Sequence, residues 1–199
     1  MKTICVYCGS NAGNDPAYAA QAEALGARLA ADGIALVYGG GNVGLMGIVA
    51  DAVLANGGEV IGVIPQQLVD WEVAHRGVTR LEVVDSMHTR KARMFELSDG
   101  FVALPGGFGT LDELMEALTL IQTGKARKIP LILVCSEFWG GLITWFKERL
   151  VGEGMVDPED IDLIQVIDEP EKVVEAIFKH YESRPFGPLP NEHEMLLNL

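Results

Sequence analysis

Short apolar runs rich in β-branched residues alternate with longer stretches of helical composition along the chain. Continuous apolar runs bounded by glycine, proline or aspartate are typical of strands that are buried on both faces of a sheet. We predict strands at Thr3–Tyr7, Ile34–Tyr38, Val60–Ile64, Thr79–Val84, Gly100–Leu104, Pro130–Val134 and Asp162–Val166. Strands of this kind favour a parallel sheet with both faces covered.

Between these runs, the spacing of apolar and polar residues predicts helices. The first is well marked, because Asp15 is a natural N-cap, Pro16 suits the first turn and Gly33 provides a stop. We predict helices at Pro16–Ala31, Leu45–Ala55, Met87–Leu97, Leu111–Gln122, Leu142–Val151 and Pro170–Tyr181. The alternation predicts an α/β fold: a Rossmann-like, doubly wound, mostly parallel sheet of about seven strands with helices on both faces.

The domain organisation is predicted to be simple. No internal repeat or linker divides residues 1–182, which we expect to form a single Rossmann-like domain. Residues 183–199 contain Pro185, Pro188 and Pro190, which forbid a continuous helix. We therefore expect this segment to be a surface tail, packed on a partner subunit in an oligomer.

The charge balance limits the classes of partner. The chain has 199 residues with 15 Lys+Arg against 28 Asp+Glu, a net charge of −13. Nucleic-acid binding is disfavoured, because non-specific affinity for a phosphate backbone comes from clustered cations. No apolar run approaches the ~20 residues of a membrane helix. The first residues lack a secretory signal, so we expect a cytoplasmic protein that binds no membrane.

Cysteine and histidine positions give little support to redox or metal chemistry. Cys5 and Cys8 form a CxxC inside a predicted strand, whereas a redox pair places its first thiol at a helix N-terminus, so core packing is the better interpretation. Cys135 ends another apolar run, and the four histidines are scattered without HxH or HExxH spacing. We predict no metal and no cofactor.

Ligands of open parallel sheets bind at the carboxyl ends of the strands, where three loops of this chain are rich in glycine. The first offers the Ser10 hydroxyl. The second, YGGGNVGLMG, matches G-x-G-x-x-G at Gly39, Gly41 and Gly44, but it follows the second strand and no acid ends the next one. A dinucleotide site is therefore disfavoured. Two interpretations remain open: close approach of a ligand to the backbone, or close packing of the helix on the sheet.

The third loop, ALPGGFGTLDE, is the most informative stretch. Pro105 stops the strand, the glycines permit close approach, and a helix begins near Thr110, where its amides and dipole favour an anion. No Lys stands in the register of a nucleotide-triphosphate loop, so a monophosphate fits better. Glu113 has two interpretations of equal weight, a functional carboxylate or the second half of a capping box with Thr110.

A cation cluster precedes this loop. MHTRKARM, residues 87–94, carries Arg90, Lys91 and Arg93 without an acid and opens the helix that leads toward the PGG loop. Solvent exposure is the usual explanation for such a run. A guanidinium beside an anion-binding helix terminus would instead hold a phosphate or orient a carboxylate.

Together these motifs resemble the LOG family, the cytokinin riboside 5′-monophosphate phosphoribohydrolases, formerly labelled possible lysine decarboxylases. The similarity runs in order through CVYCGS, VYGGGNVGLMG, IPQQLVDWEVAH, MHTRKARM and PGGFGTLDE. The resemblance implies that Arg90 and Glu113 are the catalytic pair and that the PGG loop binds a 5′-phosphate. The substrate-binding positions that it implies are Ser10, Gly40, Gly41, Glu72, Lys91, Pro105, Gly106, Gly107, Phe108, Gly109, Thr110, Leu111, Asp112 and Thr119.

The activity implied by the resemblance is hydrolysis of the N-glycosidic bond of an adenosine 5′-monophosphate to the free base and ribose 5-phosphate. The family is dimeric, and an apolar fraction of roughly 58% with glycine counted, above the ~45–50% typical of soluble domains, agrees with a homodimer or higher homo-oligomer. Where plant members carry Trp-x-Gln-Leu-Gly, this chain has Leu120-Ile121-Gln122-Thr123-Gly124, which leaves open the choice between prenylated AMP and plain AMP.

Two alternatives compete with this hypothesis. A non-catalytic nucleotide or phosphorylated-cofactor binding protein of the same fold would need the glycines but not both Arg90 and Glu113. A lysine decarboxylase would need a Lys poised for a pyridoxal phosphate Schiff base. Lys91 is the one Lys in a candidate segment, and its neighbouring arginines suit phosphate contact better.

Overall fold

The computed structural model describes residues 3–71, 74–126 and 128–182. Within these residues one seven-stranded parallel sheet has the order β4-β3-β2-β1-β5-β6-β7. The predicted α/β fold is confirmed, and the sheet is parallel throughout. The strands are β1 (Thr3–Tyr7), β2 (Ala35–Tyr38), β3 (Val60–Pro65), β4 (Arg80–Val84), β5 (Phe101–Ala103), β6 (Leu131–Leu133) and β7 (Ile164–Val166).

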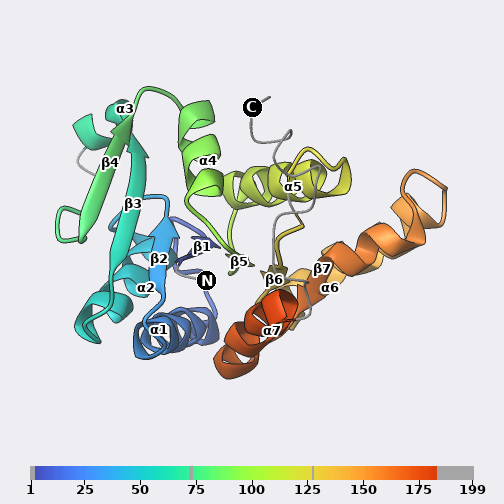
Figure 1. Ribbon diagram of the computed structural model, residues 1–199, viewed down its shortest axis with the longest axis horizontal. Helices are drawn as coiled ribbons and strands as arrows, with labels where there is room; N and C mark the ends of the chain where they lie inside the picture. Colours follow the sequence, from blue (N-terminus) through green and yellow to red (C-terminus); the bar gives the residue numbers. More distant parts are fainter. Residues whose placement is uncertain (1–2, 72–73, 127, 183–199) are drawn as a thin grey trace.

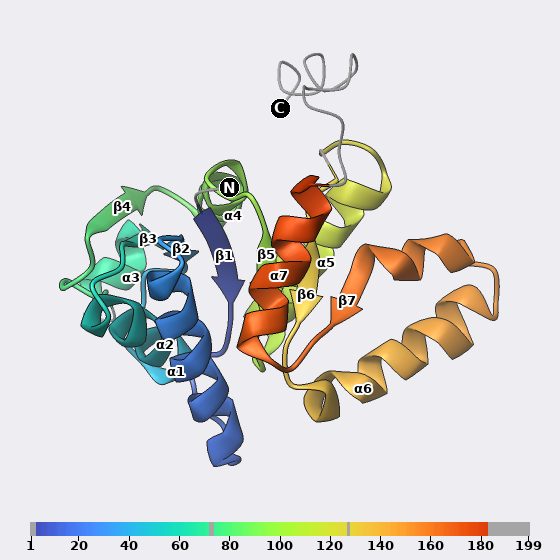
Figure 2. The ribbon, with the colours of Figure 1, turned by 60° about the horizontal axis from the view of Figure 1, so that its bottom comes forward.

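Helices cover both faces of the sheet (Figures 1 and 2). One apolar core joins the sheet to α1 (Pro16–Ala31), α2 (Gly44–Ala55) and α7 (Pro170–Glu182). A second core joins the opposite face to α4 (Met87–Glu96), α5 (Phe108–Gln122) and α6 (Ser136–Trp145). The CxxC cysteines belong one to each core and are buried, which confirms the packing interpretation of Cys5 and Cys8.

The first helix forms as its sequence predicts. The Asp15 carboxylate accepts a hydrogen bond from the Ala17 N–H at 2.9 Å, and Pro16 occupies the first turn. The burial of Leu25 and Leu29 against α2 and the sheet anchors one face of α1. Capping and one-sided burial together explain why this segment is helical.

The prediction of a helix at Leu142–Val151 is wrong about where the helix starts. Helix α6 begins six residues earlier, at Ser136, and continues as a π-helical turn over Phe146–Val151. Gly140 and Gly141, which discourage a helix on propensity alone, lie inside it. A residue far along the sequence determines the start of the helix, because the Asp168 carboxylate accepts hydrogen bonds from the N–H groups of Cys135 and Ser136.

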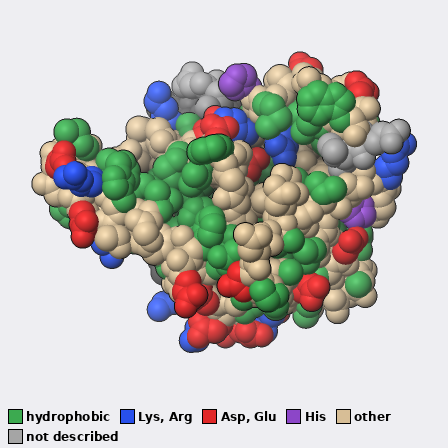
Figure 3. All heavy atoms as spheres, turned by 180° about the vertical axis from the view of Figure 1, so that it is seen from behind, with side chains coloured by type: hydrophobic (Ala, Val, Ile, Leu, Met, Phe, Trp, Pro, Cys, Tyr) green, Lys and Arg blue, Asp and Glu red, His purple; other side chains and the backbone are tan. Residues whose placement is uncertain are grey.

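This longer helix forms an arm that extends away from the rest of the molecule in Figures 1 and 2. Its return leg is a 3-10 helix, Pro158–Leu163, so β7 begins at Ile164 rather than at Asp162. Figure 3 shows hydrophobic side chains gathered over the arm and the adjoining surface. Trp145, the last residue of α6, and Met155 have 51% and 70% of their surface exposed.

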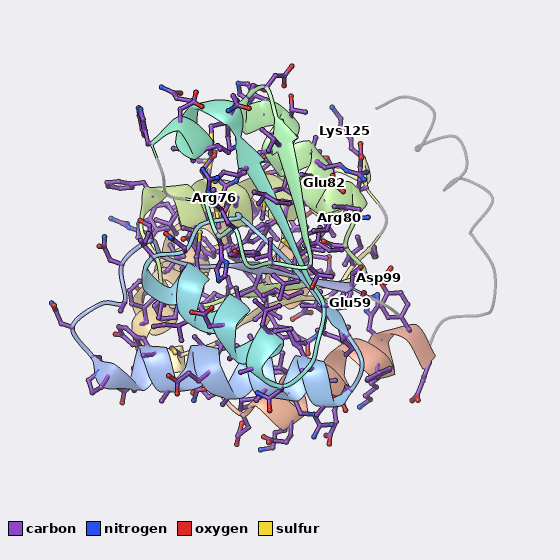
Figure 4. All side chains as sticks on the ribbon, turned by 90° about the vertical axis from the view of Figure 1, so that its left-hand side faces the viewer. Glu59, Arg76, Arg80, Glu82, Asp99 and Lys125 are labelled. Carbon is purple, nitrogen blue, oxygen red and sulfur yellow. The ribbon has the colours of Figure 1, made fainter. Side chains whose placement is uncertain are left out.

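The edge strand β4 carries charged side chains. Glu82 forms ion pairs with Arg80 on the same strand and with Arg93 on α4, at 3.1 and 2.7 Å. Figure 4 shows Arg80 and Glu82 on this strand, with Glu59 and Asp99 at the amino-terminal edge of the sheet. Charge on an edge strand discourages pairing with another sheet.

The chain turns in opposite directions from β1 and β5, which are neighbours in the centre of the sheet. Their following loops therefore separate and leave a crevice at the carboxyl ends of the strands. The Gly9 N–H donates to the Pro105 carbonyl at 3.0 Å, which joins the two loops at the base of this crevice.

Candidate active site

A pocket of about 390 Å³ occupies the crevice and is lined by the loops after β1, β2 and β5 and by α2, α3 (Gln66–Asp70), α4 and α5. Short helix α3 is not among the predicted elements, because its five residues are too few for a periodic pattern. The lining consists of Val6, Cys8, Gly9, Ser10, Gly39, Gly41, Val43, Met46, Ile64, Leu68, Arg90, Gly107, Phe108, Gly109, Thr110 and Glu113.

Arg90 enters the pocket from the first turns of α4 and is only 7% exposed. Its Nε donates to the Val63 carbonyl and its Nη2 donates to the Gly39 carbonyl, both at 3.0 Å. These carbonyls end two neighbouring strands, so the sheet itself holds the planar guanidinium. Nη1 remains directed toward Glu113, with 3.3 Å between Nη1 and Oε1.

Glu113 lies on α5 and is 8% exposed. Burial raises the pKa of its carboxyl above the ordinary value, and the Arg90 guanidinium opposes part of that rise. The capping-box interpretation is wrong, because α5 begins at Phe108 with Gly107 as its N-cap, one turn before Glu113. The side chain therefore faces the pocket and Arg90.

The PGG loop and the first turn of α5 supply the anion-binding features. The helix begins at Phe108, three residues before the predicted start at Leu111, so Phe108, Gly109 and Thr110 form its first turn. N–H groups of a first turn lack intrahelical acceptors and carry the positive end of the helix dipole. The Ser10 and Thr110 residues also line this part of the pocket, and Thr110 is buried.

The glycines of this loop meet different constraints. A Cβ at Gly106 would overlap the Thr110 hydroxyl, so Gly106 is required by the fold. A Cβ at Gly109 would meet nothing within 4 Å. A requirement for glycine at position 109 would therefore come from a bound ligand and not from the packing of the chain.

Three predicted site residues lie in a different place. Lys91, Asp112 and Thr119 line a separate shallow depression between α4 and α5 of about 280 Å³. The Lys91 Nζ lies 2.9 Å from both the Asp112 and Glu116 carboxylates. Partial burial opposes the charge of Lys91, but these hydrogen bonds outweigh it and raise the pKa of the ammonium. The structure does not bring these residues to the pocket.

The remaining predicted residues fall in three groups. Pro105 and Gly106 line a smaller pocket of about 210 Å³ that shares Gly9, Ser10 and Gly107 with the main one. Gly40 and Leu111 are structural: Gly40 has a φ of 74° and packs on Ile64, and Leu111 packs against the core beneath α5. Glu72 lies outside the described residues, as does the predicted tail at 183–199.

Several contributors to the pocket escape a sequence search. The Gly39 and Val63 carbonyls act through the backbone, so no side-chain pattern marks them. Leu68 and Met46 line the pocket as ordinary apolar residues of helices. The one available signal is position, because each lies within a few residues of the carboxyl end of a strand.

Within residues 3–71, 74–126 and 128–182, no three His, Cys, Asp or Glu side chains converge as metal ligands would. Over the same part of the chain, no helix has the length and apolar character needed to cross a membrane. The fold and the pocket define a doubly wound α/β protein in which the N-terminus of α5 stands beside a buried arginine–carboxylate pair.

Comparison with known sequences identifies the family. A family model described as "Possible lysine decarboxylase" matches residues 46–177. A cytokinin riboside 5′-monophosphate phosphoribohydrolase of Arabidopsis thaliana is 44% identical over 158 residues, 79% of this chain and 74% of that protein. The protein of the same name from Rhodococcoides fascians is 41% identical over 177 residues, 88% and 89% of the two chains. The chain belongs to this family, the LOG family, as its motifs predict.

Solved structures support the fold. The molybdenum cofactor carrier protein of Chlamydomonas reinhardtii superposes with a TM-score of 0.68 at 20% identity over 92% of this chain and 99% of that one. The molybdenum cofactor binding protein of Rippkaea orientalis gives a TM-score of 0.67 at 23% identity over 91% and 98%. At these identities the likeness concerns the fold alone.

Proposed function

We propose that this protein hydrolyses the N-glycosidic bond of adenosine 5′-monophosphates, N6-substituted or plain. Water and the nucleotide would give the free base and ribose 5-phosphate. The observation that carries the proposal is the buried Arg90–Glu113 pair facing the pocket that α5 opens with its N-terminus. The names of the relatives at 41–44% identity support the same reaction class.

The phosphate would lie at the first turn of α5. Phe108, Gly109 and Thr110 line the pocket there together with Ser10, and the N–H groups of this first turn have no intrahelical acceptor. These groups attract a dianion in a chain whose net charge is −13, because the partial positive charge is local and fixed in direction. The open space at Gly109 would let phosphate oxygens approach the backbone.

Spacing along α5 then relates the phosphate to the reacting carbon. Glu113 follows Gly109 and Thr110 by one helical turn, about 5–6 Å on the same helix face. The anomeric carbon of a ribose 5-phosphate lies at a comparable distance from its phosphorus. A nucleotide anchored at the helix terminus would therefore present its glycosidic bond to the Glu113 carboxylate.

Glu113 would act at this bond as a carboxylate. Departure of the base leaves positive charge on the ribose, which an adjacent carboxylate stabilises directly or by activating the attacking water. Arg90 would hold the carboxylate in a single orientation, because its own position is fixed by two backbone carbonyls. Burial strengthens both interactions by excluding water.

The base would occupy the apolar part of the pocket, where Ile64, Leu68 and Met46 provide the lining.

We also propose a homodimer or higher homo-oligomer. Support comes from exposed apolar side chains at or near the pocket, including Phe108 at 91% and Trp71 at 64% exposure. Light scattering of the purified chain would check this, and a monomer at micromolar concentration would contradict it.

A carrier function is disfavoured by Glu113. A protein that only holds an anionic ligand loses affinity from a buried carboxylate in the same pocket, so its retention points to chemistry. A pyridoxal phosphate enzyme is disfavoured because the Lys91 ammonium is paired with two carboxylates outside the pocket.

Product chromatography tests the proposed function. Purified protein is incubated with AMP, with N6-isopentenyladenosine 5′-monophosphate and with the two corresponding nucleosides. We expect free base and ribose 5-phosphate from the monophosphates, with kcat/KM at least a hundredfold lower for the nucleosides, because phosphate binding positions the ribose. Absence of free base from both monophosphates would overturn the proposal in favour of a binding protein. Equal kcat/KM for nucleotide and nucleoside would contradict the proposal that the first turn of α5 binds the 5′-phosphate.

A further inference from the structure

The loop between α3 and β4 is fastened to the glycine loop after β2. The His75 N–H donates to the Gly40 carbonyl at 2.8 Å, and Ala74 forms an antiparallel bridge with Gly41. Gly39, one residue earlier, supplies the carbonyl that accepts from Arg90 Nη2. The backbone that holds Arg90 is therefore bound directly to the segment that carries His75.

The His75 side chain secures this segment to α2. Its Nε2 lies 2.9 Å from the Asp51 Oδ1, and its Nδ1 accepts a hydrogen bond from the Gly77 N–H at 3.1 Å. Because Nδ1 is an acceptor, the proton of the neutral ring is on Nε2, which donates to the Asp51 carboxylate. Both ring nitrogens are thus engaged, and the ring has one orientation.

We propose that the His75–Asp51 pair is a positioning device for the Arg90–Glu113 pair. It fixes the loop at Ala74–Gly77 against Gly40 and Gly41, which fixes the Gly39 carbonyl, the Arg90 guanidinium and, through it, the Glu113 carboxylate. The inference rests on the proposed function. It assigns to His75, a residue that touches neither the pocket nor Glu113, an effect on turnover.

A contribution to global stability alone does not account for this arrangement. The Asp51 side chain is 71% exposed, and a polar contact with one solvated partner contributes little to the free energy of unfolding. The His75 side chain is only 14% exposed and lies on a loop, where a small displacement is transmitted to the Gly39 carbonyl. Small misplacements of catalytic groups reduce turnover far more than they reduce stability.

The test compares His75→Ala, Asp51→Ala and the double variant with His75→Gln, whose amide can still donate to Asp51. Arg149→Ala is the matched control, since it breaks an exposed ion pair with Glu153 on the arm. We expect His75→Ala and Asp51→Ala each to lower kcat about tenfold with KM within about twofold. The double variant should be no worse than either single one, and His75→Gln should recover most of the lost kcat.

Hydrogen exchange provides a readout that needs no turnover. We expect faster exchange of the peptide spanning residues 39–42 in His75→Ala and unchanged exchange in Arg149→Ala. Unchanged kcat and unchanged exchange in His75→Ala would overturn the positioning role, as would equal kcat losses in His75→Gln and His75→Ala. If the wild type releases no base, the proposed function has failed, and exchange at residues 39–42 still decides whether His75 holds the loop.

Discussion

Two neighbouring cations of α4 form ion pairs with carboxylates of α5, one in a buried environment and the other in a solvated one. Arg90 meets Glu113 with both side chains 9% exposed, and Arg90 is also bound to two backbone carbonyls. Lys91 meets Asp112 and Glu116, whose side chains are 60% and 44% exposed. Arg90 and Lys91 are adjacent on α4, as Asp112 and Glu113 are on α5, so both contacts pair a cation with a carboxylate. Burial makes the difference, because it raises the pKa of Glu113 and directs its carboxylate into the pocket.

Replacement of Arg90 by Met should have the largest effect on the buried pair. Glu113 would lose its partner, and the Gly39 and Val63 carbonyls would lose a buried donor. We expect kcat/KM for AMP to fall by at least about a thousandfold and the protein to lose about 3–5 kcal/mol of stability at neutral pH. Steady-state kinetics and urea denaturation would measure both. A loss of less than tenfold would show that the buried pair is structural.

The Gly39→Ala substitution should cause the next largest loss of activity. An added Cβ at this position would overlap Arg90 Nη2, so the guanidinium must move away from Glu113. We expect kcat to fall about a hundredfold, because the orientation of the carboxylate is lost while both charges remain. Gly140→Ala is the matched control, since its Cβ would meet no atom and the residue lies in α6, outside the pocket lining. Full kcat in Gly39→Ala would contradict the role of the Gly39 carbonyl.

The pH dependence separates the two pairs further. A raised pKa keeps the Glu113 carboxyl protonated to a higher pH, so the active carboxylate is lost earlier on acidification. We expect kcat/KM to fall tenfold per pH unit on an acid limb above the ordinary glutamate value of about 4.3. The free energy of unfolding depends on pH in the opposite direction. Glu113 stabilises the native state most at low pH, and this contribution falls as pH rises through the raised pKa. An acid limb at or below pH 4 would exclude Glu113 as the titrating group.

Replacement of Lys91 by Gln should have the smallest effect. Its partners are solvated, and the residue lines a depression rather than the pocket. We expect kcat/KM to change by less than about threefold and stability by less than about 1 kcal/mol. Because the Lys91 charge lowers the pKa of Glu113, the acid limb should move slightly upward. A loss above about a hundredfold in kcat/KM would place Lys91 at the substrate, in agreement with the resemblance and against this account.

Much of the fold follows from local sequence. Buried strands such as β1 and the capped helix α1 are specified by their own residues, so pattern and capping are sufficient to predict them. The start of α6 is not local, because it depends on Asp168 more than thirty residues later and on a φ of 78° at Cys135. No periodicity in Ser136–Gly141 could reveal that partner.

The sequence predicted the parts of the site that consist of side chains in recognisable motifs. Arg90 and Glu113 stand in motifs, and the structure brings them together. Sequence could not decide between Lys91 and Arg90 as the residue at the pocket, because the two are adjacent and differ only in the face of α4 that they occupy. Nor could the sequence exclude the capping box, since that depends on a helix start three residues earlier than the pattern indicates.

The most direct test of the central claim compares Glu113→Gln with Asp112→Asn. Each change removes one negative charge from adjacent residues of α5, and each carboxylate pairs with a cation of α4. The measurement is kcat for release of free base from N6-isopentenyladenosine 5′-monophosphate. The account predicts a loss of at least about a thousandfold for Glu113→Gln and less than about threefold for Asp112→Asn. Comparable losses in the two variants, or retained turnover in Glu113→Gln, would contradict it.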